Sequence, residues 1–313
     1  MTSCSSEFAL IAKYFAPLAT APGAFGLKDD AALVPQRAGH DIVVTTDTVV
    51  AGIDFFADDP PETIAKKALR VNLSDLAAKG AEPAAYLLSL SLPRVDEAWL
   101  AAFAQGLRED QARFGLSLLG GDTGGTPGPL SIAITAFGHV PSGGMIRRSG
   151  ARVGDGVFVT GTIGDSGGGL ALLKGEPGAA LSAAQRDALI ARYRVPEPPA
   201  GFALRGVASA GIDVSDGLIA DLGHIAAASR VRIVVEAARI PRSDALTALW
   251  GGDIARAATS GDDYQTAFTS SGTSAASGVT ATRIGRVEEG AGVVLLDANG
   301  REIAVTRPGF IHF

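Results

Sequence analysis

The architecture of the chain follows from residues 41–92, whose sequence is DIVVTTDTVVAGIDFFADDPPETIAKKALRVNLSDLAAKGAEPAAYLLSLSL. The β-branched run at 41–47 predicts a strand that ends on an acid. Apolar residues at helical spacing between Pro60 and Gly80 predict a helix that begins at a proline and ends at a glycine. The run at 85–92 alternates in its second half, which predicts a second strand. Strands and helices mixed in this way favour the α/β or α+β class.

The rest of the chain continues this mixture. An amphipathic pattern opened by Ser6 predicts a helix over 6–15, and another helix is predicted over 95–114. Further strands are predicted at 116–122, 130–140, 157–161, 211–214, 231–236 and around 264–269, 282–287 and 292–297, with helices that end near Lys174 and Ser229.

A length of 313 residues corresponds to about two domains. The basic, glycine-rich run RRSGARVGDG (147–156) is turn-like and is interpreted as the joint between them. We therefore predict an N-terminal domain over 1–146 and a C-terminal domain over 147–313.

Composition excludes several classes of protein. Apolar residues make up 47% of the chain and charged residues 19%, so the sequence has no signature of disorder. The net charge is −6 and no run of Lys or Arg exceeds two residues, which argues against a nucleic-acid partner. The 40 glycines suggest many tight turns or many places where backbone approaches a ligand closely.

The sequence predicts a cytoplasmic protein with no membrane partner. Its one cysteine, Cys4, excludes an internal disulfide and any CxxC site. Glu7 and Lys13 interrupt the first apolar stretch, which is therefore unlike a secretory signal. The longest stretch without Asp, Glu, Lys or Arg, 123–146, contains three prolines and six glycines and does not predict a spanning helix.

The informative feature is a series of aspartates just after predicted strands or beside small residues. Such positions are where sites on α/β sheets are usually built. Any single one could instead be a turn or cap residue, and Asp75 with Lys79 could form an ordinary ion pair along a helix. The series comprises Asp29, Asp30, Asp47, Asp75, Asp122, Asp213, Asp216, Asp262 and Asp263.

These aspartates favour magnesium-dependent chemistry. Carboxylates that converge without matching Lys or Arg repel one another unless cations neutralise them. Oxygen ligands and few histidines point to Mg²⁺ rather than zinc, and Mg²⁺ at such sites usually also coordinates substrate phosphates. Nucleotide-dependent phosphoryl transfer is the natural hypothesis.

The usual phosphate-binding signatures are absent from the sequence. No Lys follows a Gly, so there is no Walker A loop, and no HRD/DFG pair marks a protein kinase. Each of three glycine-rich loops, at 120–128, 161–169 and 260–264, could present backbone N–H groups to an anion or be a plain turn.

A hydrolase is the alternative from another class. Residues 164–168 match G-x-S-x-G, with Ser166 as nucleophile and Asp213 with His224 or His312 in the required chain order. Against it, TGTIGD intervenes between the predicted strand and Ser166, which gives a loop rather than a sharp nucleophile elbow.

Seven motifs in order resemble the thiamine-monophosphate kinase family, a branch of the superfamily of aminoimidazole ribonucleotide synthetase and selenophosphate synthetase. The resemblance covers essentially the whole chain, and NLSDLAA with IDVSDGL is specific to this branch. The motifs are TTDTVVAG (45–52), KALRVNLSDLAAKGAEP (67–83), GGDT (120–123), RSGARVGD (148–155), VTGTIGDSGGGL (159–170), IDVSDGLIADLGH (212–224) and SGDDY (260–264).

The resemblance implies an N-terminal metal- and ATP-binding domain that pairs with a second copy to form a shared β-barrel, and hence a homodimer, with a C-terminal α/β domain. It implies transfer of phosphate from ATP to thiamine monophosphate, giving thiamine diphosphate. The acceptor is already an anionic phosphate monoester, so no general base is needed and transfer is direct, assisted by several Mg²⁺ ions.

Site residues are carried over by position. The metal ligands implied are Asp30, Thr45, Thr46, Asp47, Asp75, Asp122, Asp213 and Asp216. The nucleotide contacts implied are Gly121, Asp122, Arg148 and Ser215. Phe310 matches an aromatic position that stacks on substrate, and Asp54 and Asp262 occupy substrate-side positions.

Three departures from the family pattern concern the acceptor. Lys28 stands where the family usually has Gly, Asp54 where it has His, and DDYQ (262–265) where it has EDYE. Asp54 is interpreted as facing the thiazolium or aminopyrimidine of the acceptor, although it could turn to solvent or bind a further Mg²⁺. The alternatives are a paralogue acting on another phosphorylated small molecule, another ligase of the superfamily, or a non-catalytic nucleotide-binding protein.

Overall fold

The computed structural model describes residues 7–272 and 280–311 as a mixed α/β chain, as predicted. It forms two compact units: one runs to Leu76 and from Ala81 to Gly143, and the other holds Ala77–Gly80 and the residues from Gly144 on. Ser6, Cys4 and His312 lie outside the described residues. No helix of the described part is both long and apolar enough to cross a membrane.

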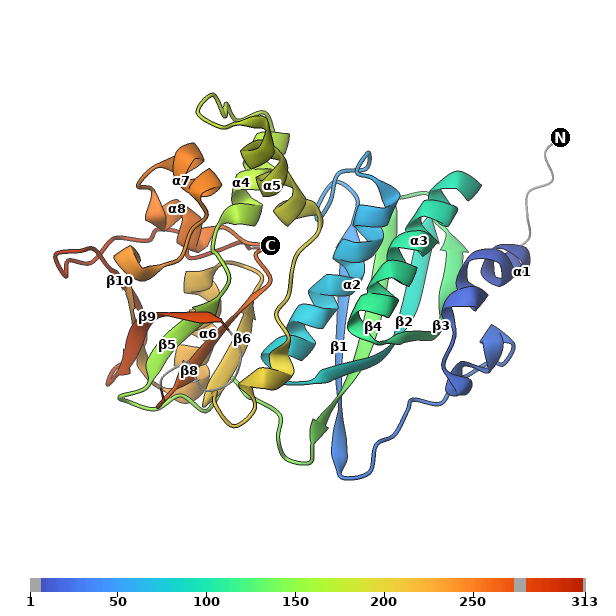
Figure 1. The fold of residues 1–313 in the computed structure, drawn as a ribbon, viewed down its shortest axis with the longest axis horizontal. Coiled ribbons are helices and arrows are strands. Elements are labelled where there is room, and N and C mark those ends of the chain that lie inside the picture. The colour runs from blue at the N-terminus through green and yellow to red at the C-terminus, as the bar shows by residue number, and fades with distance from the viewer. Residues whose placement is uncertain (1–6, 273–279, 312–313) are drawn as a thin grey trace. The chain divides into compact units, whose positions relative to one another are not determined.

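The first unit is a four-stranded sheet with two helices on one face (Figure 1). The strand order is β1 (His40–Val50), β4 (Ser131–Pro141), β2 (Glu82–Leu92) and β3 (Ser117–Gly125). Only the β2–β3 pair is parallel. Alternate residues of β4 (Ile132, Ile134 and Ala136) are fully buried. This period of two is expected of a sheet with one covered face.

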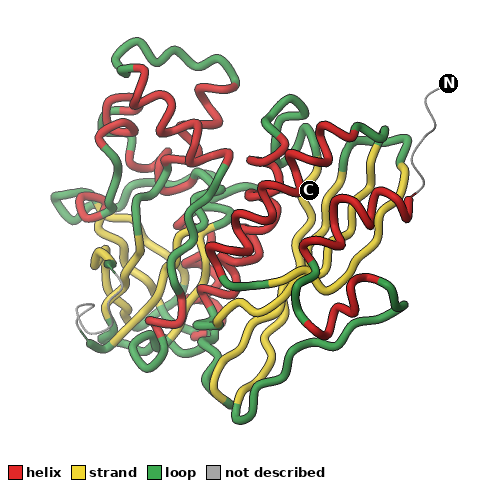
Figure 2. Tube along the Cα trace, turned by 45° about the vertical axis from the view of Figure 1, so that its right-hand side comes forward, coloured by secondary structure: helices red, strands yellow, loops and turns green. Residues whose placement is uncertain are grey.

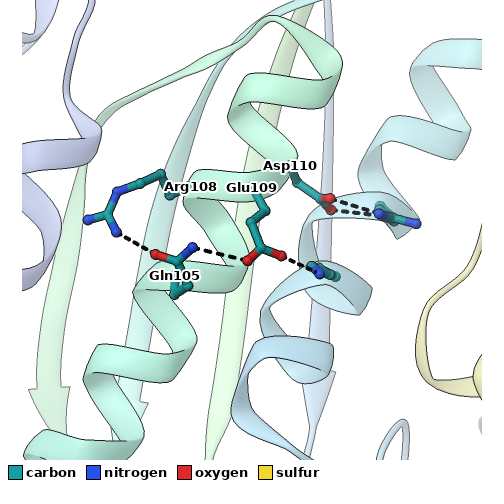
Figure 3. A network of polar contacts seen from close by, with 6 residues as sticks. Gln105, Arg108, Glu109 and Asp110 are labelled. Atoms are coloured by element: carbon teal, nitrogen blue, oxygen red, sulfur yellow. Dashed lines mark hydrogen bonds and ion pairs between the residues drawn. The ribbon is translucent and has the colours of Figure 1, made fainter.

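Helices α2 (Pro61–Ala78) and α3 (Glu97–Phe114) cover that face and are joined by charged side chains (Figure 3). Arg70 donates to both carboxylate oxygens of Asp110 at 2.7 and 2.8 Å, and both residues are buried. Lys66 contacts Glu109 at 2.6 Å near the surface. A buried bidentate pair fixes geometry because losing either partner leaves an unpaired buried charge. It therefore holds α2, which carries Asp75, against α3.

Of two predictions for the first unit, one is confirmed and the other needs correction. The helix predicted over 6–15 is present from Glu7 as α1 (Glu7–Leu10) and a π-helical turn η1 (Ile11–Phe15), which continue without a break into a 3₁₀ turn η2 (Ala16–Leu18). A further 3₁₀ segment, η3 (Pro22–Leu27), follows. The strands predicted to end at Asp47 and Asp122 instead continue to Val50 and Gly125, so these aspartates lie inside strands.

The second unit contains a six-stranded sheet in the order β10-β7-β9-β5-β8-β6. Its strands, like those of the first unit, are yellow in Figure 2. Helix α6 (Leu218–Ser229) packs on the sheet through Leu222 and Ile225, which join a buried core with Ile212, Val214 and Ile233. The strands are β5 (Gly156–Thr160), β6 (Ala210–Val214), β7 (Arg232–Glu236), β8 (Gln265–Ser270), β9 (Ala281–Glu288) and β10 (Gly292–Leu296).

A second helical layer in this unit was only partly predicted. It contains α4 (Asp165–Leu173), α5 (Ala183–Arg194), α7 (Asp244–Trp250) and α8 (Ile254–Thr259), of which only α4 was expected. The missed helices carry N-terminal signals: Ser182 forms a capping box with Gln185, Ser243 caps α7 and Asp253 caps α8.

Candidate functional site

Two aspartates of the first unit face each other across the packing of α2 on β1. The Thr45 hydroxyl donates to Oδ2 of Asp75 at 2.5 Å, which turns Asp75 toward the strand. Burial raises the pKa of Asp47 to about 6, with further upward contributions from Asp75 and Asp54. A half-buried carboxylate with further carboxylates beside it is a place where a cation is stabilised.

Asp54 belongs to the turn that follows β1. Its Oδ2 accepts the N–H of Val50 at 2.8 Å, and its backbone carbonyl accepts from Lys67 Nζ at 2.7 Å. The side chain is half-buried and close enough to Asp47 to affect its pKa. One carboxylate oxygen of Asp54 therefore closes the turn beside the carboxylate pair.

A second group of predicted residues lies around a hollow of about 580 Å³ in the same unit, which is lined by Asp29, Asp30, Gly121 and Asp122 together with apolar side chains such as Phe15 and Phe137. Asp122 is exposed on β3. Gly121 has a φ of +157°, and a Cβ there would lie 1.8 Å from the carbonyl oxygen of Leu88, so only glycine fits this strand pairing.

Strand register separates these two groups. Asp47 pairs with Ile134, which pairs with the buried Leu88, so these three lie on the helix-covered face. Asp122 pairs with Ser89 in the next row, on the opposite face. The neighbouring Thr46 shares that opposite face, where its hydroxyl accepts from Thr135. Asp47 and Asp122 lie on the two edge strands, which three strand spacings place about 14 Å apart.

In the second unit the predicted residues gather at the turn after β6. Ser215 and Asp216 are half-buried, and Asp213 is buried on β6 opposite Thr266. Asp221, which was not predicted, accepts the backbone N–H groups of Ser215, Asp216 and Gly217 on one oxygen at 3.0, 3.1 and 3.1 Å. Burial, with a contribution from Asp216, raises its pKa to about 7 even though these hydrogen bonds lower it.

Both substrate-side residues of this unit, Asp262 and Phe310, donate backbone hydrogen bonds to this same turn. The N–H of Asp262 donates to the carbonyl of Ser215 at 2.7 Å, and the N–H of Phe310 donates to the carbonyl of Asp216 at 2.9 Å. Asp262 has a φ of +68°, a strained conformation for a residue with a side chain. Phe310 is half exposed. Arg148 lies elsewhere on the surface, where its carbonyl accepts from Ser229.

The loop around Ser166 is structural, and the hydrolase hypothesis is wrong. Ser166 is buried, and its hydroxyl donates to the carbonyl of Arg192 at 3.0 Å, while His224 is exposed on α6. Asp263 is fully buried and accepts the N–H of Gly164 at 2.6 Å. Burial raises the pKa of Asp263 well above its usual range, and the hydrogen bond from Gly164 opposes the shift. Asp263 therefore holds the glycine-rich loop.

The residues fit Mg²⁺ only as part of a substrate complex. Among the described residues, no group of three or more His, Cys, Asp or Glu side chains is arranged to hold a metal ion on its own. Mg²⁺, however, keeps several waters and usually takes one or two protein carboxylates plus substrate phosphates. The uncompensated Asp47–Asp75 pair supplies that donor set.

Comparison with known proteins defines the class first. The N-terminal domain of AIR synthase related proteins matches residues 28–140, and their C-terminal domain matches residues 152–297. The thiamine-monophosphate kinase of Caulobacter vibrioides is 42% identical over 98% of this chain and 91% of its own length. The chain therefore belongs to the thiamine-monophosphate kinase family, and the resemblance drawn from its motifs is confirmed.

Solved structures agree with this assignment. Thiamine-monophosphate kinase from Stenotrophomonas maltophilia K279a is 41% identical with a TM-score of 0.80, covering 88% of this chain and 91% of that one. AaThiL complexed with AMPPCP and TMP is 32% identical with a TM-score of 0.79, covering 93% of this chain and 97% of that one.

We predict that Asp47→Asn stabilises the metal-free protein at pH 8. The pKa of Asp47 is higher in the folded chain, so ionisation costs the folded state stability as pH rises from about 4 to 6. Removing the charge should gain about 1–3 kcal/mol of unfolding free energy at pH 8, and progressively less toward pH 5. Urea unfolding in EDTA measures this.

Asp58→Asn, which removes an exposed charge from the same unit, is the control and should change stability little. Added Mg²⁺ should stabilise the wild type more than Asp47→Asn. A loss of stability in Asp47→Asn at pH 8 would make this carboxylate structural.

Proposed function

We propose that this chain transfers the terminal phosphoryl group of ATP directly to thiamine monophosphate, giving thiamine diphosphate and ADP. It is an ATP-dependent phosphotransferase of thiamine biosynthesis. The Caulobacter relative, similar over nearly the whole chain, and the AaThiL complex with AMPPCP and TMP support the reaction. The observation that carries the chemistry is the Asp47–Asp75 pair, which two anionic substrates can approach only with cations between them.

The residues act by holding and aligning the two polyanions. Mg²⁺, when bound, neutralises the phosphates and the carboxylates together. Asp75, oriented by the Thr45 hydroxyl, and Asp47 would hold the Mg²⁺ that the phosphates need. No base has to remove a proton from the acceptor. Positioning and electrostatics then supply the rate. The proposed metal ligands are Asp30, Thr45, Thr46, Asp47, Asp75, Asp122, Asp213 and Asp216, and the proposed nucleotide contacts are Gly121, Asp122, Arg148 and Ser215.

Purified protein with MgATP and thiamine monophosphate should form ADP and thiamine diphosphate in equal amounts. Mass spectrometry of the products measures this. Direct transfer leaves no phosphorylated protein. A panel of other phosphomonoesters tests the paralogue hypothesis. If one of them is turned over faster than thiamine monophosphate, that compound is the natural acceptor. A phosphoprotein trapped in a single turnover would contradict direct transfer.

Asp54, where the family has His, is proposed to face the cationic end of the acceptor. Asp54→Asn keeps an oxygen for the Val50 N–H but loses the charge. We expect it to raise KM for thiamine monophosphate several-fold, with KM for ATP and thermal stability nearly unchanged. If Asp54→Asn or Asp54→His improves kcat/KM, the carboxylate opposes this acceptor and the natural one is different.

We further propose a homodimer in which the sheets of two copies close into a barrel. Within the described residues β1 pairs only with β4 and β3 only with β2, so both outer edges of the sheet are available. The face away from the helices exposes Ile42 and Val44. Two-fold closure with β3 of one copy beside β1 of the other would remove both edges.

Light scattering tests the homodimer. The purified protein should have about twice the mass of one chain at micromolar concentration. A monomer under these conditions would contradict this arrangement.

The division of labour between domains follows as part of the same proposal. Residues 1–146 would form the metal- and ATP-binding and dimerisation domain, and residues 147–313 the C-terminal α/β domain. The cytoplasmic location stays a prediction.

A further inference from the structure

We propose that Asp221 is a positioning residue of the phosphoryl-transfer site. It fixes the direction of two backbone carbonyl groups, and these accept hydrogen bonds from the two acceptor-side residues, Asp262 and Phe310. The inference rests on the proposed function for its kinetic readout. It rests on the structure alone for the geometry.

Asp221 lies one turn into α6 and is only 2% exposed. Its Oδ2 accepts from three successive backbone N–H groups, those of Ser215, Asp216 and Gly217. The N-cap residue of α6 is Gly217, which has no side chain to cap the helix and has a φ of +131°. The conformation of this turn therefore depends on a carboxylate that reaches back from inside the helix.

Peptide planarity extends the effect of Asp221 beyond the N–H groups. The N–H of Asp216 and the carbonyl of Ser215 belong to one rigid peptide plane and point in opposite directions. The same holds for the N–H of Gly217 and the carbonyl of Asp216. Fixing the two N–H groups on Asp221 therefore also fixes the direction of the two carbonyl groups.

Those two carbonyl groups anchor the residues proposed to meet the acceptor. The Ser215 carbonyl accepts from the N–H of Asp262 at 2.7 Å, and the Asp216 carbonyl accepts from the N–H of Phe310 at 2.9 Å. Gly309 lies so close that a Cβ on it would be 2.5 Å from the Asp216 carbonyl oxygen. The turn thus joins Ser215 and Asp216, proposed for nucleotide and metal, to both acceptor-side residues.

The test is the pair Asp221→Ala and Asp221→Asn in the full-length protein. Ala removes the acceptor, and we expect KM to rise tenfold or more for both ATP and thiamine monophosphate. Asn retains one neutral oxygen that can accept these hydrogen bonds. Asp221→Asn should therefore raise both KM values only about threefold. Assays run well below the melting temperature of each variant separate site geometry from unfolding.

Asp155→Ala is the matched control, because Asp155 is also buried and accepts the Arg152 N–H and the Ser209 hydroxyl in the turn before β5. It should lower the melting temperature with both KM values within twofold of wild type. If Asp221→Ala behaves like this control, Asp221 only caps α6 and the proposal is wrong. If Asp221→Ala does not fold, Asp221→Asn decides, and unchanged KM values overturn the proposal.

Calorimetric binding of Mg-AMPPCP separates this proposal from the proposed function. A wild-type protein that binds the analogue but makes no thiamine diphosphate contradicts the function alone. Weaker binding by Asp221→Ala than by Asp155→Ala would still support the positioning role, and equal binding would refute it.

Discussion

The packing of α2 against β1 places two carboxylates, Asp47 and Asp75, side by side in a half-buried position. Burial and, after it, repulsion from Asp75 oppose this arrangement, and together they raise the pKa of Asp47. The surrounding structure prevents the pair from separating. The buried Arg70–Asp110 pair holds α2 to α3, and Gly106 lets α3 approach so closely that a Cβ there would be 2.5 Å from the Glu62 carbonyl oxygen. The repulsion is therefore retained as affinity for a cation.

The sequence alone predicted much of this arrangement because hydrophobic periodicity reports which residues a sheet or helix buries. The strands around Asp47, Asp122 and Asp213 and the helix that carries Asp75 were all expected near their observed positions. Their ends were not. β1 continues past Asp47 because Val49 pairs with Ile132, a contact between residues far apart in the chain that no local pattern contains.

The sequence alone also could not predict which of two neighbouring aspartates is fully buried. Asp262 and Asp263 are adjacent and chemically identical, yet one is half-buried in a strained turn and the other is fully buried as an acceptor for Gly164. Asp221 lies inside a quoted motif, but its sequence context predicted no role in the site, because an acid in the first turn of a helix is ordinary. Only the three N–H groups that meet it in space reveal its position.

These contacts suggest a physical criterion for telling the aspartates of this chain apart. Asp221 and Asp263 are buried among backbone N–H donors, which offset part of the cost of desolvation without any ion. Asp47 and Asp75 instead face each other, and Asp75 accepts from the hydroxyl of Thr45 rather than from backbone N–H groups. A carboxylate given amide donors by its own fold is satisfied before substrate arrives, so it can shape a site but gains little from binding a cation. A carboxylate paired with another carboxylate is satisfied only when a cation comes, so its stability and its function change together when Mg²⁺ and the phosphates bind.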